Sequence, residues 1–312
     1  MRLPAYSSAV QRRYAIIGSG ALGGFYGARL QRAGCEVHFL LHSDYEHVRK
    51  HGLRCDSKDG DFHLPHVHAY QHARDLPPCD VVIVALKTTH NHLLAELLPP
   101  TGAVLTLQNG LGNEEAIAAV TGPERVLGGV AFLCSHKVGP GHIRHLDYGQ
   151  VTLGEFSTSV VTERLRQIGA DFERAGIPVR LEPDLRMVRW RKLVWNIPFN
   201  GLSVILDAST DALLRHTATR ALIVDLMREV VHGANACGAR LTDADIEQMM
   251  QYSDRMTPYK PSMKLDFEAG RPLEVEAIFG EPLRRAQRAG VTLPRIETLY
   301  RQLFFLDARR RP

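Results

Sequence analysis

Three polar side chains recur at every fourth position between residues 192 and 200: Lys192, Asn196 and Asn200. This spacing places one ammonium and two carboxamides along a single helix face. Amides among apolar neighbours such as Trp195 and Phe199 are costly if buried without partners, so they need either protein partners or a ligand. Taken singly, a solvated lysine or a satisfied core amide explains each residue. As a row beside aromatic rings, they form a candidate binding or catalytic site.

Three other polar positions are candidates for a ligand site. Asn109 lies in the loop Gln108–Gly112, directly after a predicted strand, and open α/β sheets bind ligands at the carboxyl ends of their strands. Ser262 and Glu274 lie further along the chain. The alternatives are an ordinary Asn-Gly turn, a helix N-cap at Ser262 and a solvated carboxylate at Glu274.

A glycine-rich segment near the N-terminus fits the pattern G-x-G-x-x-G, with the residues Gly18, Ser19, Gly20, Ala21, Leu22 and Gly23. It follows a predicted strand and opens a predicted helix, which is the context that a dinucleotide fingerprint requires. The first glycine allows a tight turn, the second lets the backbone approach a pyrophosphate, and the third permits close helix–strand packing. A glycine-rich turn of another α/β fold is the alternative.

The end of the second predicted strand decides between NAD and NADP. An acidic residue there accepts the ribose 2′-hydroxyl, whereas a basic residue holds a 2′-phosphate. His42 and Ser43 occupy this position, and neither is acidic, which favours NADP over NAD. Asp44 comes later in the segment and leaves NAD open.

The elements that must position these residues fall into two groups. Up to about Val151, short β-branched runs alternate with helical or Gly-bounded stretches, which predicts βαβ units and a mainly parallel sheet. The predicted strands are Tyr14–Ile17, Glu36–Leu41, Val81–Ala85, Ala103–Leu107 and Val126–Phe132, with a helix over Ala21–Ala33 that stops at Gly34. We expect His142–Glu155 to form a hairpin that turns at Tyr148 and Gly149.

Helical patterns dominate after Thr158. The predicted helices are Val160–Ala175, Thr217–Cys237, Asp243–Tyr252, Ala277–Ala289 and Arg295–Leu306, in addition to the one that carries Lys192 and is expected to kink at Pro198. A short strand, Val179–Leu181, precedes the break at Pro183. The sequence thus predicts a tail (1–13), a Rossmann-type doubly wound parallel sheet (14–183) and an all-helical C-terminal domain (184–312).

Composition excludes several classes of protein. The chain has 312 residues with a net charge of +4, too many for one ordinary core. No apolar run approaches the roughly 18 residues of a membrane span, and residues 1–13 lack the apolar stretch of a secretory signal. Basic and acidic residues are interspersed, which argues against nucleic acid. We expect a cytoplasmic protein, without a membrane partner, that acts as a monomer or homodimer.

Metal binding and disulfides are not expected. The five cysteines are odd in number, widely spread and without a C-x-x-C pair, which predicts reduced thiols. Four nearby histidines have no second ligand set at metal spacing, and we interpret them as a surface hairpin: His63, His66, His68 and His72.

The ordered set of motifs resembles the 2-dehydropantoate 2-reductase (ketopantoate reductase) family from Tyr14 to about Leu306. The set comprises G-S-G-A-L-G, A-L-K ending at Lys87, Q-N-G-L-G, R-K-L-x-x-N-x-x-x-N, P-S-M-x-x-D and E-V-E. The resemblance implies NADPH and a keto acid held between a Rossmann domain and a helical domain. It also implies reduction of ketopantoate to pantoate, on the route to pantothenate and coenzyme A.

The resemblance also implies roles for single residues. Lys192 would be the general acid and Glu274 its carboxylate partner, while Asn196, Asn200 and Ser262 would contact the substrate. Asn109 would contact both cofactor and substrate, and Lys87 would lie nearer the cofactor. A charge-assisted donor suits an oxygen that gains negative charge as hydride arrives, which agrees with this role of Lys192.

His42 departs from the family, because many members carry an arginine there to bind the 2′-phosphate. This departure leaves the preference between NADP and NAD open. Two other functions remain as alternatives: reduction of another small 2-keto or hydroxy acid, and a cofactor-sensing protein that binds NADP without catalysis.

Overall fold

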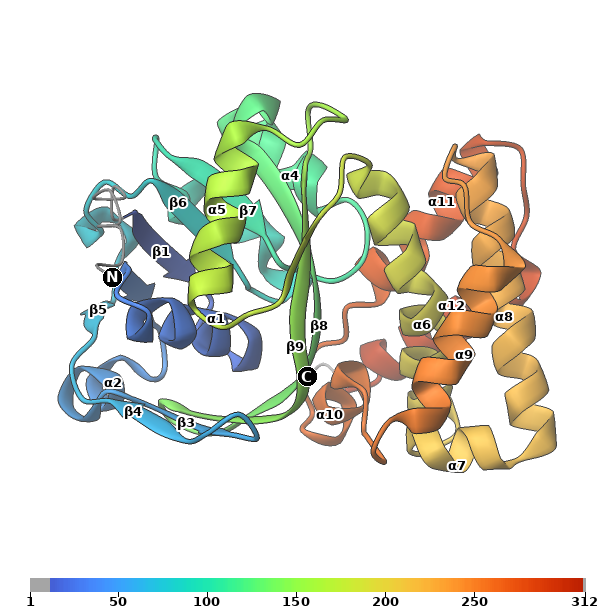
Figure 1. Ribbon diagram of the computed structural model, residues 1–312. Coiled ribbons are helices and arrows are strands. Elements are labelled where there is room, and N and C mark those ends of the chain that lie inside the picture. Colours follow the sequence, from blue (N-terminus) through green and yellow to red (C-terminus); the bar gives the residue numbers. More distant parts are fainter. Residues whose placement is uncertain (1–11, 311–312) are drawn as a thin grey trace, which may run out of the picture. The chain divides into compact units, whose positions relative to one another are not determined.

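A computed structural model describes residues 12–310 (Figure 1). These residues divide into two compact units. The first unit runs to Leu185 but omits the loop Asn109–Asn113, and the second consists of that loop and the chain from Arg186 onward. Each unit is described separately.

Ten strands of the described chain form one sheet in the first unit. The strands are β1 (Arg13–Ile17), β2 (Glu36–Leu40), β3 (Leu53–Ser57), β4 (Phe62–Leu64), β5 (His68–Tyr70), β6 (Val81–Val84), β7 (Ala103–Thr106), β8 (Val126–Gly139), β9 (His142–Glu155) and β10 (Val179–Leu181). Their order is β4-β3-β9-β8-β7-β6-β1-β2-β5, and β10 pairs with β9. The segment from β8 through β7, β6, β1 and β2 to β5 is parallel throughout.

Side chains of the central strands alternate between two apolar layers. Tyr14 and Ile16 of β1 belong to one buried cluster, and Ala15 and Ile17 belong to another. Helices α1 (Ala21–Arg32) and α5 (Glu163–Arg174) contribute to the first cluster; α3 (Leu94–Leu97) and α4 (Asn113–Thr121) contribute to the second. Strands that are buried on both faces explain why these runs are almost wholly apolar. The predicted Rossmann-type doubly wound sheet is confirmed.

The regular elements of the second unit are all helical within its described residues. Its elements are α6 (Leu185–Ile205), α7 (Thr210–Arg215), α8 (Thr217–Ala236), α9 (Asp243–Arg255), α10 (Ser262–Glu268), the π-helical segment η4 (Glu276–Gly280), α11 (Glu281–Arg288) and α12 (Pro294–Ala308). The expected all-helical C-terminal region is therefore confirmed. Pro198 lies inside α6, and the helix continues through it. The helix that we expected over Ala277–Ala289 consists of η4 followed by α11.

Short elements of the first unit were not predicted. They are the helices α2 (Tyr45–His51), α3 and α4, the 3₁₀ turns η1 (Ala73–Asp75), η2 (Thr88–Leu93) and η3 (Pro123–Arg125), and the strands β3, β4 and β5. The strands that we did predict agree with the observed ones to within one residue at each end, except that β8 continues to Gly139.

The predicted hairpin over His142–Glu155 is wrong. These residues form the single strand β9, which pairs antiparallel with β8, and the chain turns between the two strands at Pro140 and Gly141. Tyr148 and Gly149 have positive φ angles of 57° and 124°. They form a bulge, because Phe132 pairs with Gln150 and Leu133 pairs with Tyr148, which leaves Gly149 over.

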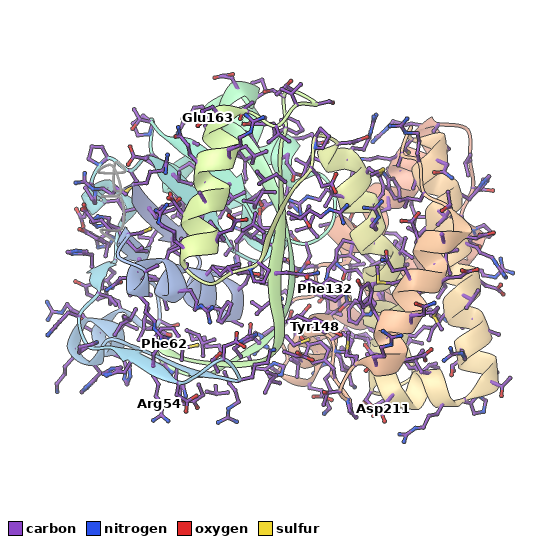
Figure 2. All side chains as sticks on the ribbon, viewed as in Figure 1. Arg54, Phe62, Phe132, Tyr148, Glu163 and Asp211 are labelled. Atoms are coloured by element: carbon purple, nitrogen blue, oxygen red, sulfur yellow. The ribbon has the colours of Figure 1, made fainter. Side chains whose placement is uncertain are left out.

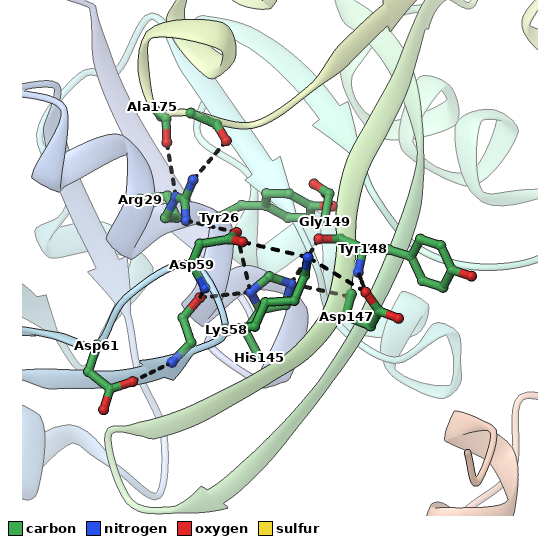
Figure 3. Close-up of polar contacts among 12 residues, drawn as sticks. Tyr26, Arg29, Lys58, Asp59, Asp61, His145, Asp147, Tyr148, Gly149 and Ala175 are labelled. Carbon is green, nitrogen blue, oxygen red and sulfur yellow. Dashed lines mark hydrogen bonds and ion pairs between the residues drawn. The ribbon is translucent and has the colours of Figure 1, made fainter. Parts of the chain in front are cut away.

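Side chains hold this bulge in place (Figure 3). The buried His145 ring bonds to the Tyr148 carbonyl oxygen through Nε2 at 2.9 Å and to Ser57 Oγ through Nδ1 at 2.9 Å. The Tyr26 hydroxyl donates to the Gly149 carbonyl oxygen at 3.2 Å, and Phe132 packs edge-on against Tyr148 (Figure 2). The left-handed φ angles of Tyr148 and Gly149 thus produce a bulge and not a turn, because β8 continues to pair with β9 on both sides of them.

The four histidines do not form one hairpin. His63 lies on β4, which pairs with β3, and His68 lies on β5, which pairs with β2 at the opposite end of the sheet. Arg54 and Phe62, labelled in Figure 2, mark the β3–β4 edge. Within residues 12–310, no three His, Cys, Asp or Glu side chains are placed to hold a metal ion.

Most of the tail expected over residues 1–13 lies outside the described residues. Its last two residues belong to the folded unit. Arg13 begins β1, and Arg12 Nη1 lies 2.9 Å from the buried Asp171 carboxylate.

Candidate active site

The glycine-rich turn joins β1 to α1. A methyl group on Gly18 would lie 2.6 Å from the Leu86 backbone nitrogen, and one on Gly23 would lie 2.1 Å from the Gly18 carbonyl oxygen. A methyl group on Gly20 would meet nothing within 4 Å. Gly18 and Gly23 are thus required by the packing of the unit itself, whereas the space beside Gly20 is open for a ligand.

The open space beside Gly20 belongs to a cavity of about 390 Å³. It is lined by the glycine turn, the end of β2 and residues from later strands and turns: Ile17, Gly18, Ser19, Gly20, Leu40, Leu41, His42, Ser43, Asp44, Gln71, Leu86, His90, Leu93, Leu97 and Lys137. The N-terminus of α1 has no side-chain cap, and the amides and dipole of a helix N-terminus favour a phosphate. These residues fit a bound dinucleotide.

Of the predicted cofactor residues, the cavity brings together Gly18, Ser19, Gly20, His42 and Ser43. Ala21, Leu22 and Gly23 form the first turn of α1. Lys87 directly precedes η2, where its carbonyl oxygen accepts a hydrogen bond from the His90 amide at 2.9 Å.

Asp44 is occupied by contacts within the first unit. Its carboxylate lies 2.6 Å from Lys137 Nζ and accepts hydrogen bonds from the Gly141 amide at 3.0 Å and from Ser43 Oγ at 3.2 Å. Burial alone would raise the pKa of this carboxyl, but the hydrogen bonds from Lys137 and Gly141 outweigh it and hold the pKa below its usual value. Asp44 is therefore ionised and already engaged, which weakens the case for it as the ribose ligand of NAD.

Sequence reasoning missed three polar residues of this cavity: Gln71, His90 and Lys137. They come from segments far along the chain from the fingerprint. Lys137 reaches the cavity because β8 extends to Gly139, seven residues past the predicted strand end at Phe132. Only the strand order could have revealed it.

The polar row of the second unit lies on α6. Asn196 and Asn200 are each 2% exposed, whereas Lys192 is half-buried. Lys192 Nζ lies 5.5 Å from the centre of the Trp195 ring, and that ring stacks on Phe199 at 5.0 Å between centroids. The aromatic pair thus supports the lysine by a cation–π contact.

Each buried amide of the row contacts another candidate segment of the same unit. Asn196 Nδ2 lies 3.4 Å from Asn109 Oδ1, and Asn200 Oδ1 accepts a hydrogen bond from the Met263 amide at 3.2 Å. Met263 follows Ser262, the first residue of α10, which shows no side-chain cap there. The structure therefore joins Asn109 to Asn196 and places Ser262 one residue from the partner of Asn200.

Glu274 lies three residues before Ala277, which contacts the loop that carries Asn109. Its carboxylate belongs to a residue that is only 4% exposed, so it is not an ordinary solvated carboxylate. The Leu111 amide donates to the Ala277 carbonyl oxygen at 2.9 Å, and a methyl group on Gly110 would lie 2.3 Å from that oxygen. Gly110 has a φ of 87°, so glycine is required on both counts. π-Helical turns such as η4 frequently occur at functional sites.

A doubly wound sheet with an open glycine turn, followed by a helical unit with a lysine and two buried amides, defines a Rossmann-type oxidoreductase of two domains. The chain belongs to the ketopantoate reductase family. Residues 14–158 match the family described as "Ketopantoate reductase PanE/ApbA", and residues 184–306 match "Ketopantoate reductase PanE/ApbA C terminal". The chain is accordingly an oxidoreductase.

Individual relatives agree with this membership. The chain is 56% identical over 309 residues to 2-dehydropantoate 2-reductase of Nostoc sp., covering 96% of this chain and 97% of that protein. It is 46% identical to the crystal structure of 2-dehydropantoate 2-reductase from Geobacter metallireducens, with a TM-score of 0.91 and coverage of 94% and 99%. A D-mandelate dehydrogenase structure, 21% identical with a TM-score of 0.87 and coverage of 96% and 99%, shares the fold.

Two further findings concern the described residues. None of their helices has the length and apolarity that crossing a membrane demands. All five cysteines are free thiols, and four of them are buried.

Proposed function

We propose that this protein catalyses the NADPH-dependent reduction of 2-dehydropantoate (ketopantoate) to pantoate, on the route to pantothenate and coenzyme A. Family membership and the near-full-length relatives support this substrate. The observation that carries the proposal is the α6 row, in which a half-buried lysine precedes two amides that are 2% exposed. The domain division is proposed as 14–183 for the cofactor and 184–312 for the substrate.

In this proposal the first domain holds NADP. The turn Gly18–Gly23 receives the pyrophosphate, His42 and Ser43 face the adenosine ribose, and Lys87 lies nearer the nicotinamide. When bound, the cofactor supplies the hydride that reduces the C2 carbonyl. The contacts of Asp44 with Lys137, Gly141 and Ser43 support NADP over NAD.

Lys192 acts as the general acid. As negative charge develops on the C2 oxygen, the ammonium stabilises it and then donates a proton, which yields the hydroxyl of the product. Its cation–π contact with Trp195 limits the positions that the ammonium can adopt. Glu274 is proposed as the carboxylate partner of this lysine; a carboxylate with so little exposure must be paired.

The amides and Ser262 orient the substrate. Asn196, Asn200 and Ser262 would donate hydrogen bonds to the carboxylate and contact the hydroxyl of the keto acid, and Asn109 would contact both substrate and cofactor. The bond between Asn196 and Asn109 is long, at 3.4 Å, so both amides can turn toward a ligand at small cost.

We further propose that the enzyme acts in the cytoplasm as a monomer or homodimer. Free thiols, four of them buried, suit a reducing compartment.

NADPH oxidation in the presence of ketopantoate, and of a panel of other branched 2-keto acids, tests the proposal. We expect turnover that is fastest with ketopantoate and faster with NADPH than with NADH. Turnover confined to another keto acid would make that acid, and not ketopantoate, the substrate. NADPH binding without turnover of any keto acid would instead indicate a cofactor-sensing protein.

A further inference from the structure

An ion pair lines the cavity at the end of β2. Lys137 Nζ of β8 and the Asp44 carboxylate lie 2.6 Å apart, and both residues line the same cavity as Gly18, Ser19 and Gly20. The Lys137 side chain is 34% exposed, so its ammonium remains accessible from solvent. A cation therefore shares one cavity with the turn that receives a pyrophosphate.

The end of β2 itself supplies no permanent cation. His42 and Ser43 are exposed, and neither offers the permanently charged, bidentate fork of an arginine. A 2′-phosphate carries close to two negative charges, so a binding site for it requires at least one fixed cation. Among the described residues that line this cavity, Lys137 is the one that carries a fixed positive charge.

We propose that Lys137 binds the 2′-phosphate of NADPH and is the residue of this chain that selects NADP over NAD. This inference rests on the proposed function. His42 and His90 line the same cavity and add hydrogen-bond donors. The ammonium has three N–H donors, and the ion pair with Asp44 uses one of them.

Asp44 positions the lysine. Its second contact, with the Gly141 amide at 3.0 Å, ties the start of α2 to the turn that follows β8, the strand that carries Lys137. The Asp44 carboxylate is compensated by these two donors, which reduces its repulsion of a phosphate. A lysine held in this way loses less conformational entropy when a ligand binds.

Two fragments of the cofactor differ only in the 2′-phosphate and so isolate its contribution to binding: adenosine 2′,5′-bisphosphate and adenosine 5′-monophosphate. Their dissociation constants are measured by calorimetry on the full chain, in the wild type and in Lys137→Ala, Lys137→Gln and Lys137→Arg. Lys50→Ala is the matched control, because Lys50 is an exposed lysine of the same unit and does not line the cavity. These measurements need neither turnover nor a keto acid.

We expect Lys137→Ala and Lys137→Gln to raise the dissociation constant of the bisphosphate by about tenfold or more, because one charge-assisted hydrogen bond is lost. The monophosphate should change less than about twofold, because it lacks the group that Lys137 contacts. Lys137→Arg should keep most of the affinity, and Lys50→Ala should change neither.

Two results would overturn the inference. In the first, the wild type prefers the bisphosphate, and this preference survives in Lys137→Ala and Lys137→Gln. Lys137 would then not bind the 2′-phosphate, and the NADP proposal would stay intact. A wild type that binds both fragments equally removes the NADP preference and, with it, the role of Lys137.

Discussion

The two ligand regions of this chain are built by different means. The proposed cofactor cavity of the first unit is shaped mainly by backbone: Gly18 and Gly23 allow close packing, and Gly20 leaves space. The α6 row of the second unit depends on side chains, namely one ammonium and two amides that are 2% exposed. Added atoms are therefore expected to damage the first region, whereas removed atoms are expected to damage the second.

The largest effect is expected at Lys192. Lys192→Ala should lower kcat by about two orders of magnitude or more, the usual contribution of a general acid. The dissociation constant of NADPH should stay within about twofold, since the cavity of the first unit is unchanged. Steady-state kinetics and fluorescence titration measure the two quantities, with Lys50→Ala as the control. Unchanged kcat would remove Lys192 from the mechanism.

The glycine turn gives the next largest effect. Gly20→Ala should fold normally, because its methyl group meets nothing within 4 Å. It should weaken NADPH binding by about tenfold or more, because that space is proposed to receive the pyrophosphate. Gly23→Ala should instead lower the free energy of unfolding by about 1–3 kcal/mol through overpacking. Chemical denaturation and NADPH titration distinguish the two variants.

Gly139→Ala controls for the substitution itself, since a methyl group there would lie 4.0 Å from its nearest neighbour, His142 Cβ. If Gly20→Ala bound NADPH as tightly as the control does, the backbone cradle would not be the cofactor site.

Asn200 tests the second region by removing atoms. Asn200→Ala leaves the Met263 amide buried without its acceptor and should lower the free energy of unfolding by about 1–3 kcal/mol. Asn196→Ala removes only the 3.4 Å contact with Asn109, so it should cost less stability and act mainly by raising the KM for the keto acid. Equal losses of stability in the two variants would contradict this division of roles.

The smallest effect concerns the scaffold of the first unit. Burial lowers the pKa of His145, and this outweighs the opposing effect of the Tyr148 carbonyl oxygen. The unfolded chain, with a histidine pKa near 6.5, therefore binds more protons as the pH falls. Stability should be fully present above pH 6.5 and decrease below it, toward the lower folded-state pKa, by at most about 1.4 kcal/mol per pH unit for this one group.

His145→Gln should reduce this slope in urea denaturation series between pH 7 and pH 5. Part of the slope should remain, because burial also lowers the pKa of His38 and His136. An identical pH dependence in the variant and the wild type would show that His145 does not titrate on unfolding.

Much of the fold could be predicted because its signals are local. The apolar runs of β1, β2, β6 and β7 are buried on both faces, so their composition alone identifies them. The α6 row could likewise be predicted from a spacing of four residues within one helix. The glycine fingerprint combines a strand, a turn and a helix that are contiguous in the chain.

What could not be predicted depends on partners distant in sequence. Tyr148 and Gly149 adopt left-handed φ angles that suit a turn or a bulge, and only the continued pairing with β8 selects the bulge. β4 and β5 are three residues each, too short to show a pattern. Lys137 reaches the proposed cofactor cavity through strand order, which no local motif encodes.

The most direct test of the account follows the hydride itself. NADPH carrying deuterium on the transferable position of its nicotinamide is incubated with ketopantoate and the enzyme, and the product is examined by mass spectrometry and NMR. The account predicts pantoate with deuterium at C2, formed by the wild type and Lys50→Ala and at least about 100-fold more slowly by Lys192→Ala. Absence of labelled pantoate with the wild type, despite bound NADPH, would contradict it.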